Sequence, residues 1–134
     1  MSGKFGEKYY DLTLNALRIM AAFLYMIHGG QKLFGWFGMG PMPGVWPFGV
    51  AGVIEFFGAL ALAFGLFTRP IAFLAAGETA VVYWWMHASK SGSIWPWVNH
   101  GEAPALYCFI WLVIWTSGGG SKTIDAWLAK RRAA

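Results

Sequence analysis

Four long apolar segments, separated by short stretches that contain glycine and proline, constrain this chain more than any other feature. They cover about residues 12–34, 48–67, 70–87 and 102–117. A helix needs about 20 mostly apolar residues to cross the hydrocarbon core of a bilayer, within a range of about 17–25. The pattern predicts an all-α protein, a polytopic membrane four-helix bundle that forms one membrane domain over residues 1–134.

The composition argues against a soluble globular domain. Hydrophobic residues make up 57% of the 134 residues, aromatic residues 19% and charged residues only 12%, whereas soluble domains are about 45–50% apolar and about 25% charged. A domain of this size leaves much of its surface exposed, so it cannot hide so many apolar side chains from water. The single cysteine, Cys108, excludes an intramolecular disulfide, a CxxC redox pair and a cysteine-based zinc site.

Residues that favour turns and helix ends mark the limits of these segments. Residues 35–47 are rich in Gly and Pro and predict a loop. We expect Thr68 to cap the third helix, with Pro70 in its first turn, because a missing N–H has little effect there. The run Gly118-Gly119-Gly120 predicts the end of the fourth helix.

A short amphipathic segment follows at about residues 121–132. Ile124, Trp127 and Leu128 share one helical face, and Lys130-Arg131-Arg132 lies at the end of the segment. This pattern predicts a C-terminal helix that lies in the membrane interface rather than a fifth span.

The basic residues are distributed unevenly between the two ends of the predicted bundle. Four spans place both termini and the turn near residue 68 on one side, and eight of the ten Lys and Arg residues are on that side. Only Lys32 and Lys90 are on the other side. By the positive-inside rule we expect a multi-pass protein of a bacterial-type inner (plasma) membrane with cytoplasmic termini. The basic residues do not gather on one soluble face, so we expect no nucleic-acid partner.

Two acidic residues lie within the predicted spans, Glu55 and Glu78. A charge at the centre of a span raises the insertion free energy by about 2.5–3.5 kcal/mol. A short carboxylate cannot snorkel far, so it must be neutral, paired or facing water. We therefore expect at least one of them in a functional pocket, the alternative being a contact between helices, such as Glu78 with Arg18. Arg18 itself is expected to snorkel or to pair with Asp11.

Polar residues on the first predicted helix recur at helical spacing. Their steps of three, four and seven residues place them on one stripe that should face the bundle interior: Asp11, Asn15, Arg18, Tyr25, His28 and Lys32. His28 and Glu55 have similar expected depths, about 9 Å and about 10 Å below the outer surface, and therefore could meet. Glu78 and His87 are nine residues apart, which in a regular helix is half a turn out of phase unless Gly77 bends it.

The candidate site therefore has two parts. The candidate polar pocket contains His28, Glu55, Glu78 and Tyr25. The candidate outer entrance comprises Lys32, His87, Asn99, His100 and Glu102. No metal site is expected, and a haem site is disfavoured because His87 lies shallower than His28.

The order and spacing of several motifs resemble the DoxX family of small four-helix membrane proteins. The matching pieces are His28-Gly29-Gly30-Gln31-Lys32-Leu33-Phe34-Gly35, residues 49–58, residues 65–70, Gly77-Glu78 followed by His87, Asn99-His100-Gly101-Glu102, and the glycine-rich residues 118–125. The sequence departs from the family pattern at Ala59 and His100, where glycine is expected.

The resemblance implies a quinone-linked redox context. We expect an accessory subunit in which His28 donates a hydrogen bond, Glu55 relays protons and Lys32 attracts an anion such as thiosulfate. The sequence has no flavin, haem or iron–sulfur motif and no covalent cofactor is predicted, so a partner subunit in the membrane must carry the electrons. The alternative is a structural or assembly subunit of a larger membrane complex with no catalysis of its own.

Overall fold

The computed structural model describes residues 3–134, and every regular element in this range is a helix. In chain order the elements are α1 (Gly3–Phe34), η1 (Trp36–Gly38), α2 (Phe48–Phe64), α3 (Thr68–Val82), η2 (Tyr83–Ala88), α4 (Ser89–Ser91), α5 (Pro96–Asn99), α6 (Glu102–Ser117) and α7 (Ile124–Ala133). The chain is therefore all-α, as expected.

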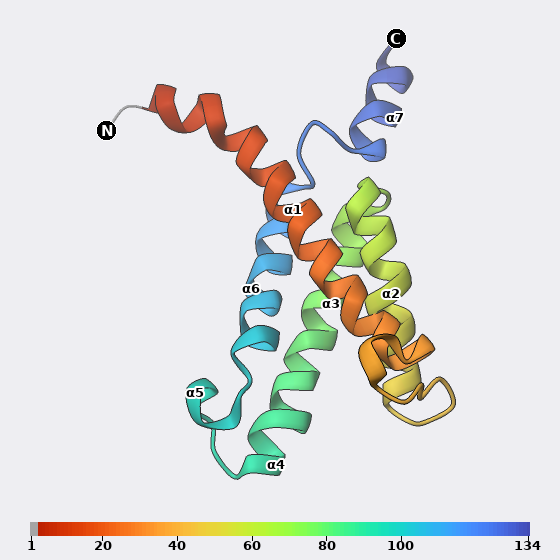
Figure 1. The fold of residues 1–134 in the computed structure, drawn as a ribbon. Coiled ribbons are helices and arrows are strands. Elements are labelled where there is room, and N and C mark those ends of the chain that lie inside the picture. Colours follow the sequence, from red (N-terminus) through yellow and green to blue (C-terminus); the bar gives the residue numbers. More distant parts are fainter. Residues whose placement is uncertain (1–2) are drawn as a thin grey trace.

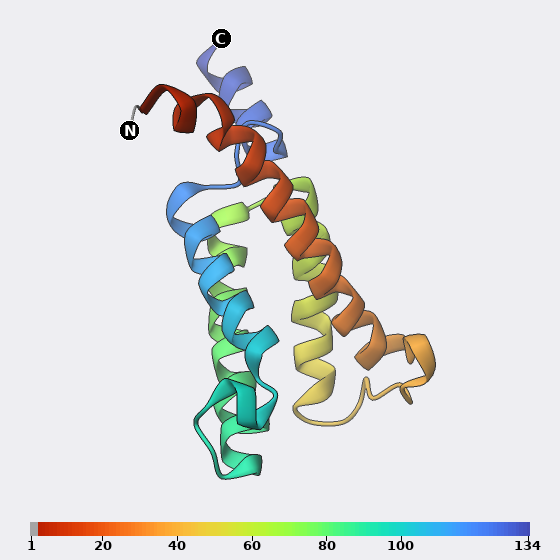
Figure 2. The ribbon, with the colours of Figure 1, turned by 60° about the vertical axis from the view of Figure 1, so that its left-hand side comes forward.

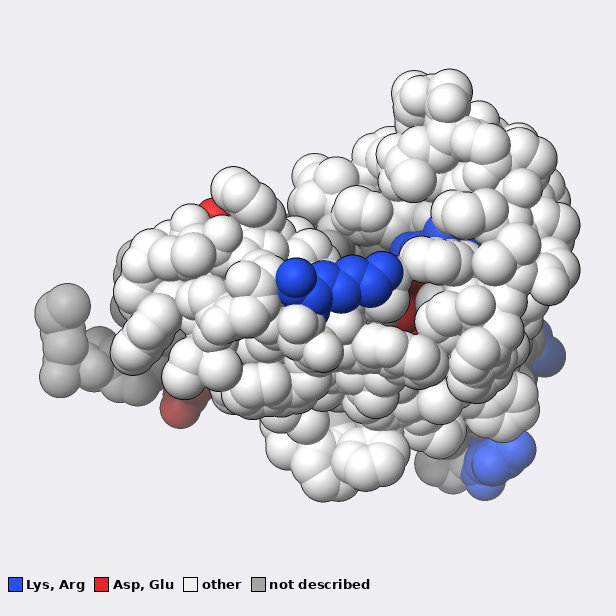
Figure 3. Space-filling view, turned by 90° about the horizontal axis from the view of Figure 1, so that it is seen from below, with Lys and Arg blue, Asp and Glu red and all other residues white. Residues whose placement is uncertain are grey.

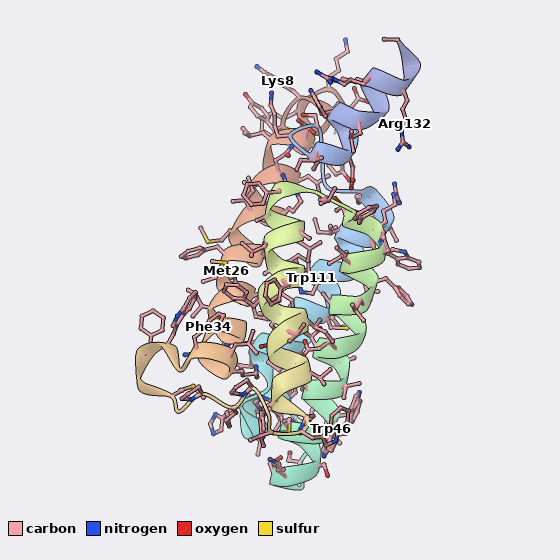
Figure 4. The ribbon with its side chains drawn as sticks, turned by 90° about the vertical axis from the view of Figure 1, so that its right-hand side faces the viewer. Lys8, Met26, Phe34, Trp46, Trp111 and Arg132 are labelled. Atoms are coloured by element: carbon pink, nitrogen blue, oxygen red, sulfur yellow. The ribbon has the colours of Figure 1, made fainter. Side chains whose placement is uncertain are left out.

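The long helices pack as two pairs. α1 packs along α2 and α3 packs along α6, while contacts between α2 and α3 join the pairs. Figure 2 shows the first pair on the right and the second on the left. We call the end that carries the chain termini the terminal end, and the opposite end, with α4 and α5, the loop end (Figure 1). Lys8 and Arg132 lie at the terminal end and Trp46 lies toward the loop end (Figure 4).

The lengths of the helices differ from those expected. Among the described residues, only the segment Lys4–Phe34 is long and apolar enough to cross a membrane by length and composition, while α2 and α6 are shorter apolar helices. The first helix begins at Gly3 rather than near residue 12, because polar residues compatible with a helix, such as Lys4, Glu7 and Lys8, extend it beyond the apolar part.

The second helix ends earlier than expected, at Phe64 rather than near residue 67. Gly65 adopts a left-handed conformation with φ of 69°. Its N–H bonds to the carbonyl of Leu62 at 3.2 Å, and the N–H of Leu66 bonds to that of Ala61 at 2.8 Å. These two bonds form a Schellman motif, which satisfies the last carbonyls and stops the helix.

The expectation that Thr68 caps α3 is wrong, because Asp125 supplies the cap. Thr68 is already the first helical residue, and the preceding Phe67 has φ of 47°. Asp125 accepts hydrogen bonds from the N–H groups of Phe67, at 2.9 Å, and of Thr68, at 2.8 Å. Burial alone would raise the pKa of Asp125, but these hydrogen bonds outweigh it and lower the pKa. The helix N-terminus thus binds the negatively charged form of a side chain from a distant segment.

Arg18 neither snorkels nor pairs with Asp11, contrary to expectation. Its side chain is fully buried, and the guanidinium donates to acceptors from three parts of the chain: Asn15 Oδ1 at 3.1 Å, the carbonyls of Leu62 at 2.7 Å and Ala63, and the carbonyls of Gly119 at 2.7 Å and Lys122 at 2.9 Å. Asp11 instead accepts from the N–H of Ser121 at 2.6 Å. Arg18 thereby joins α1 to the end of α2 and to the glycine-rich segment.

The predicted C-terminal helix begins at Ile124, three residues later than expected, because residues 118–123 form the segment that contacts α1. Thr123 caps it by accepting from the N–H of Ala126 at 3.1 Å. On its surface the guanidinium of Arg131 lies over the ring of Trp127, 4.0 Å from the centroid. The placement of α7 in a membrane interface remains a prediction.

A glycine permits the close crossing of α1 and α2. A Cβ added at Gly29 would lie 2.4 Å from the backbone nitrogen of Phe56. Backbone atoms of a neighbouring helix cannot move aside as a flexible side chain can. The two helices therefore touch at this point only because residue 29 has no side chain.

We expect Gly29→Ala to lower the free energy of unfolding in detergent by about 1–3 kcal/mol, since the added methyl group forces the helices apart. Gly6→Ala, in the same helix with nothing within 4 Å of the added Cβ, should instead raise it by about 0.5–1 kcal/mol. Thermal unfolding followed by circular dichroism measures both. Equal effects of the two substitutions would contradict the close crossing.

Arg18→Lys should lower the free energy of unfolding by about 3 kcal/mol or more. One ammonium group cannot serve all the acceptors of the guanidinium, and each buried acceptor left unpaired costs about 1–3 kcal/mol. The matched control is Arg69→Lys, because Arg69 also donates to the last carbonyls of a helix, those of Trp115 and Thr116, but is exposed. The control should lose less than about 1 kcal/mol. The same unfolding experiment compares them, and equal losses would refute the role of buried acceptors.

Candidate functional site

A hydrogen bond between Tyr25 and Glu78 connects the two helix pairs. Tyr25 lies on the polar stripe of α1 and is buried. Its hydroxyl donates to Glu78 Oε2 on α3 at 2.8 Å. The other carboxyl oxygen, Oε1, is buried without a hydrogen-bond partner within the described part of the chain. Such an atom is costly unless it binds a further group, and the carboxyl group of Glu55 on α2 lies close enough to interact with that of Glu78.

The second polar contact is an ion pair between Lys32 and Glu55. Lys32 Nζ lies 2.7 Å from Glu55 Oε1 and 2.5 Å from Oε2. Glu55 is buried and Lys32 is half-buried, and no other salt bridge occurs among residues 3–134. Glu55 and His28, which could have met at similar depth, form no hydrogen bond with each other, because Lys32, one turn farther along α1, binds both carboxyl oxygens. Lys32 therefore lies within the site rather than only at its entrance.

An apolar groove of 560 Å³ lies between α2 and α3. Its walls include Trp46, Phe48, Ile54, Phe73 and Trp85. Three polar residues complete the lining: Lys32, Glu78 and His87. We call this cavity the groove. Its shape and lining suit a ligand with a long apolar part and a polar head.

A second cavity of 270 Å³ is lined largely by polar and aromatic residues, and we call it the outer chamber. Its lining comprises Tyr25, His28, Lys32, Glu55, Thr79, Val82, His87, His100, Ala103, Pro104 and Tyr107. Viewed from the loop end, the surface is hollowed, and an acidic side chain is visible inside the hollow beside a basic one (Figure 3). Lys32, Val82 and His87 line both cavities. The two polar contacts therefore lie where the groove and the outer chamber adjoin.

His87 reaches both cavities because its segment is not a regular α-helix. Residues Tyr83–Ala88 form the π-helix η2, whose wider turn changes the angular position of every residue that follows. The expectation that Glu78 and His87 face opposite ways is therefore wrong, since both line the groove. His87 Nδ1 lies 3.0 Å from the carbonyl oxygen of Asn99, which orients the ring.

The remaining residues of the predicted entrance have different surroundings. His100 lines the outer chamber. Asn99 is buried and holds its loop closed, donating to the carbonyl of Ser93 at 2.9 Å and accepting from the N–H of Gly101 at 2.7 Å. Glu102 is exposed at the start of α6, where a negative charge is favourable. Within residues 3–134, neither Asn99 nor Glu102 lines the groove or the outer chamber.

Tyr107 is a site residue that the sequence analysis missed. It lines the outer chamber, its ring meets that of His28 edge-on at a centroid distance of 6.1 Å, and it stacks on Trp111 at 6.3 Å. Trp111 is fully buried and lies at mid-height among the helices (Figure 4). The four-residue spacing of Tyr107 and Trp111 was the available signal, since it places both rings on one face of α6.

Comparison with known proteins assigns the chain to a family. A model of the DoxX family matches residues 13–88. The chain belongs to the DoxX family. A relative from Haemophilus influenzae (strain ATCC 51907 / DSM 11121 / KW20 / Rd), named only as an uncharacterized protein, is 37% identical to this DoxX protein over 125 residues. The match covers 89% of this chain and 92% of the relative, and no solved structure matches. The DoxX match includes Tyr25, Lys32, Glu55, Glu78 and His87.

The ion pair between Lys32 and Glu55 predicts that the effect of replacing one residue on the free energy of unfolding depends strongly on whether the other is present. Lys32→Met should lower the free energy of unfolding by about 3–5 kcal/mol, because it leaves the buried Glu55 carboxylate unpaired. The double variant Lys32→Met/Glu55→Met should recover most of that loss, since neither charge remains. Denaturant unfolding in detergent measures both, with Lys90→Met as a control at an exposed lysine of the loop end. A double variant no more stable than Lys32→Met alone would contradict the predicted coupling of the pair.

Proposed function

We propose that this DoxX protein is a multi-pass membrane subunit that holds a quinone between its helix pairs and works with a partner protein that carries the electrons. One observation carries the proposal: an apolar groove is lined by Glu78, whose Oε1 is buried without a hydrogen-bond partner among the described residues.

The outer surface supports a membrane environment for all four long helices. Each exposes at least one phenylalanine, namely Phe23 on α1, Phe57 on α2, Phe73 on α3 and Phe109 on α6. Apolar surface of this extent favours lipid over water. α2 has 17 residues, the lower end of the range of about 17–25 that spans a bilayer, and α3 continues without a break into η2. The excess of Lys and Arg at the terminal end favours cytoplasmic termini.

The lining of the groove fits a quinone. The aromatic and aliphatic walls suit an isoprenoid tail, which would lie along the groove and continue into the surrounding lipid. Lys32 and His87 offer donors near ring carbonyls, and Glu78 offers an acceptor for a quinol hydroxyl. When bound, a quinone would accept two electrons and two protons to become a quinol. This chain's residues would bind and orient the head and exchange its protons, while the electrons would come from the partner.

A second candidate function is a structural or assembly subunit of a larger membrane complex. The observation that favours it is a crevice of 270 Å³ between α1 and α6, lined by apolar side chains such as Leu17, Met20, Leu24 and Leu106 together with Tyr107. Such a crevice would suit a helix of a neighbouring protein, with the polar contacts then serving only to hold the bundle together.

Filling the groove without touching its polar groups tests the quinone proposal. A Cβ at Gly77 meets nothing within 4 Å, and Gly77 lines the groove. Gly77→Leu should therefore preserve the fold and reduce the quinone retained after purification at least ten-fold. Lipid extraction followed by chromatography measures the quinone.

Gly6→Leu is the matched control, because Gly6 is a helical glycine with equally open surroundings at the terminal end. It should retain as much quinone as the parent protein. If Gly77→Leu also retained the full amount, the quinone proposal would fail. Loss of copurifying membrane proteins from variants at Leu24 and Leu106 would then favour the structural role.

A further inference from the structure

We propose that the outer chamber is the proton path of this site, and that Tyr25 passes protons between the chamber and Glu78. Exchange then takes place with the aqueous phase at the loop end and not with that at the terminal end. The inference deepens the proposed function, since it assigns the side of the membrane from which the groove gains or loses protons.

The first argument is the chemistry of the outer chamber. Its titratable and charged lining groups are Tyr25, His28, Lys32, Glu55, His87, His100 and Tyr107. His28 and His100 are exposed, whereas Glu55 is buried. The chamber therefore runs from groups exposed at the surface of the protein to groups inside it. A cavity of 270 Å³ with several polar side chains on its walls has room for water molecules that find hydrogen-bond partners there.

The second argument is the contact that links the chamber to the groove. Tyr25 lines the outer chamber, Glu78 lines the groove, and the Tyr25 hydroxyl donates to Glu78 Oε2 at 2.8 Å. Transfer along this bond is balanced: the Tyr25 O–H bond breaks as a proton joins the Glu78 carboxylate, Tyr25 takes a replacement proton from a chamber water, and that water is reprotonated from the aqueous phase at the loop end. Tyr25 ends as it began, one proton has moved to Glu78, and nothing is oxidised or reduced.

The third argument is the packing of the opposite half of the bundle. Between Glu78 and the terminal end the interior is filled by fully buried side chains from all four long helices, Ala22, Leu62, Ala72, Ala75, Trp111 and Ile114. Beyond them Arg18 occupies the centre with its bonds to backbone carbonyls. A positive charge and a close-packed apolar layer both oppose proton passage toward the terminal end.

Side-specific titration tests the proposal. The protein is reconstituted in liposomes with one orientation, determined by protease cleavage of α7, and the pH is changed on one side with an impermeant buffer. The infrared carboxyl band of Glu78, assigned by its loss in Glu78→Gln, should follow the pH at the loop end. Tyr25→Phe should slow that response at least ten-fold, whereas Tyr10→Phe, which changes an exposed tyrosine, should leave it unchanged. A response to the pH at the terminal end, or an unaltered rate in Tyr25→Phe, would overturn the proposal.

Cysteine labelling provides a test that does not depend on the folding of Tyr25→Phe. In a Cys108→Ala background, His28→Cys should react with an impermeant thiol reagent added at the loop end. Ala75→Cys, which lies in the packed layer between Glu78 and the terminal end, should react at least a hundred-fold more slowly from either side. Equal reactivity of the two would overturn the proposal. Neither experiment requires quinone. If Gly77→Leu retained its quinone, the quinone proposal would fail but the proton path could still be confirmed by these two experiments. If these two experiments failed, the proton path would be refuted and the quinone result would be unaffected.

Discussion

Polar groups far from water must be satisfied by the protein itself, and Arg18 shows how much of this fold depends on that requirement. Its guanidinium has no exposed surface and donates to carbonyls at the end of α2 and in the glycine-rich segment. Asp125 in turn holds the first N–H groups of α3. The terminal end is therefore fixed by charged side chains that bind helix termini. The apolar faces of the helices pack between this end and the loop end, where the outer chamber lies.

The positions of the helices could be predicted largely from the sequence, because apolar runs and turn residues report on them locally. The polar stripe on α1 could also be predicted from the sequence, and its residues Asn15, Arg18 and Tyr25 are buried. The hydrogen-bond partners of these residues could not be predicted. Arg18 binds backbone carbonyls, which every residue carries, so no sequence pattern announces the contact. The cap by Asp125 joins residues 57 positions apart, and only the folded arrangement of α7 and the turn before α3 brings them together.

The sequence predicted most residues of the candidate site, but not which of them contact one another. Depth estimates place His28 and Glu55 at one level, but Lys32 is longer and reaches the carboxylate first. The predicted orientation of His87 relative to Glu78 was wrong for another reason. A single turn of π-helix changes the angular position of every later residue, and the hydrophobic pattern of the sequence does not reveal it. Tyr107 was not predicted because α6 carries no charge between Glu102 and its end, so no polar stripe like that around Tyr25 marks its face of the helix.

The partners of Arg18 also impose an order on biogenesis. Leu62 follows it by 44 positions, whereas Gly119 follows by 101 and Lys122 by 104. While the ribosome is still making the later helices, the first helix carries an arginine whose final acceptors have not yet been synthesised. The bonds of Arg18 to Gly119 and Lys122 can therefore form only after almost the whole chain has been synthesised.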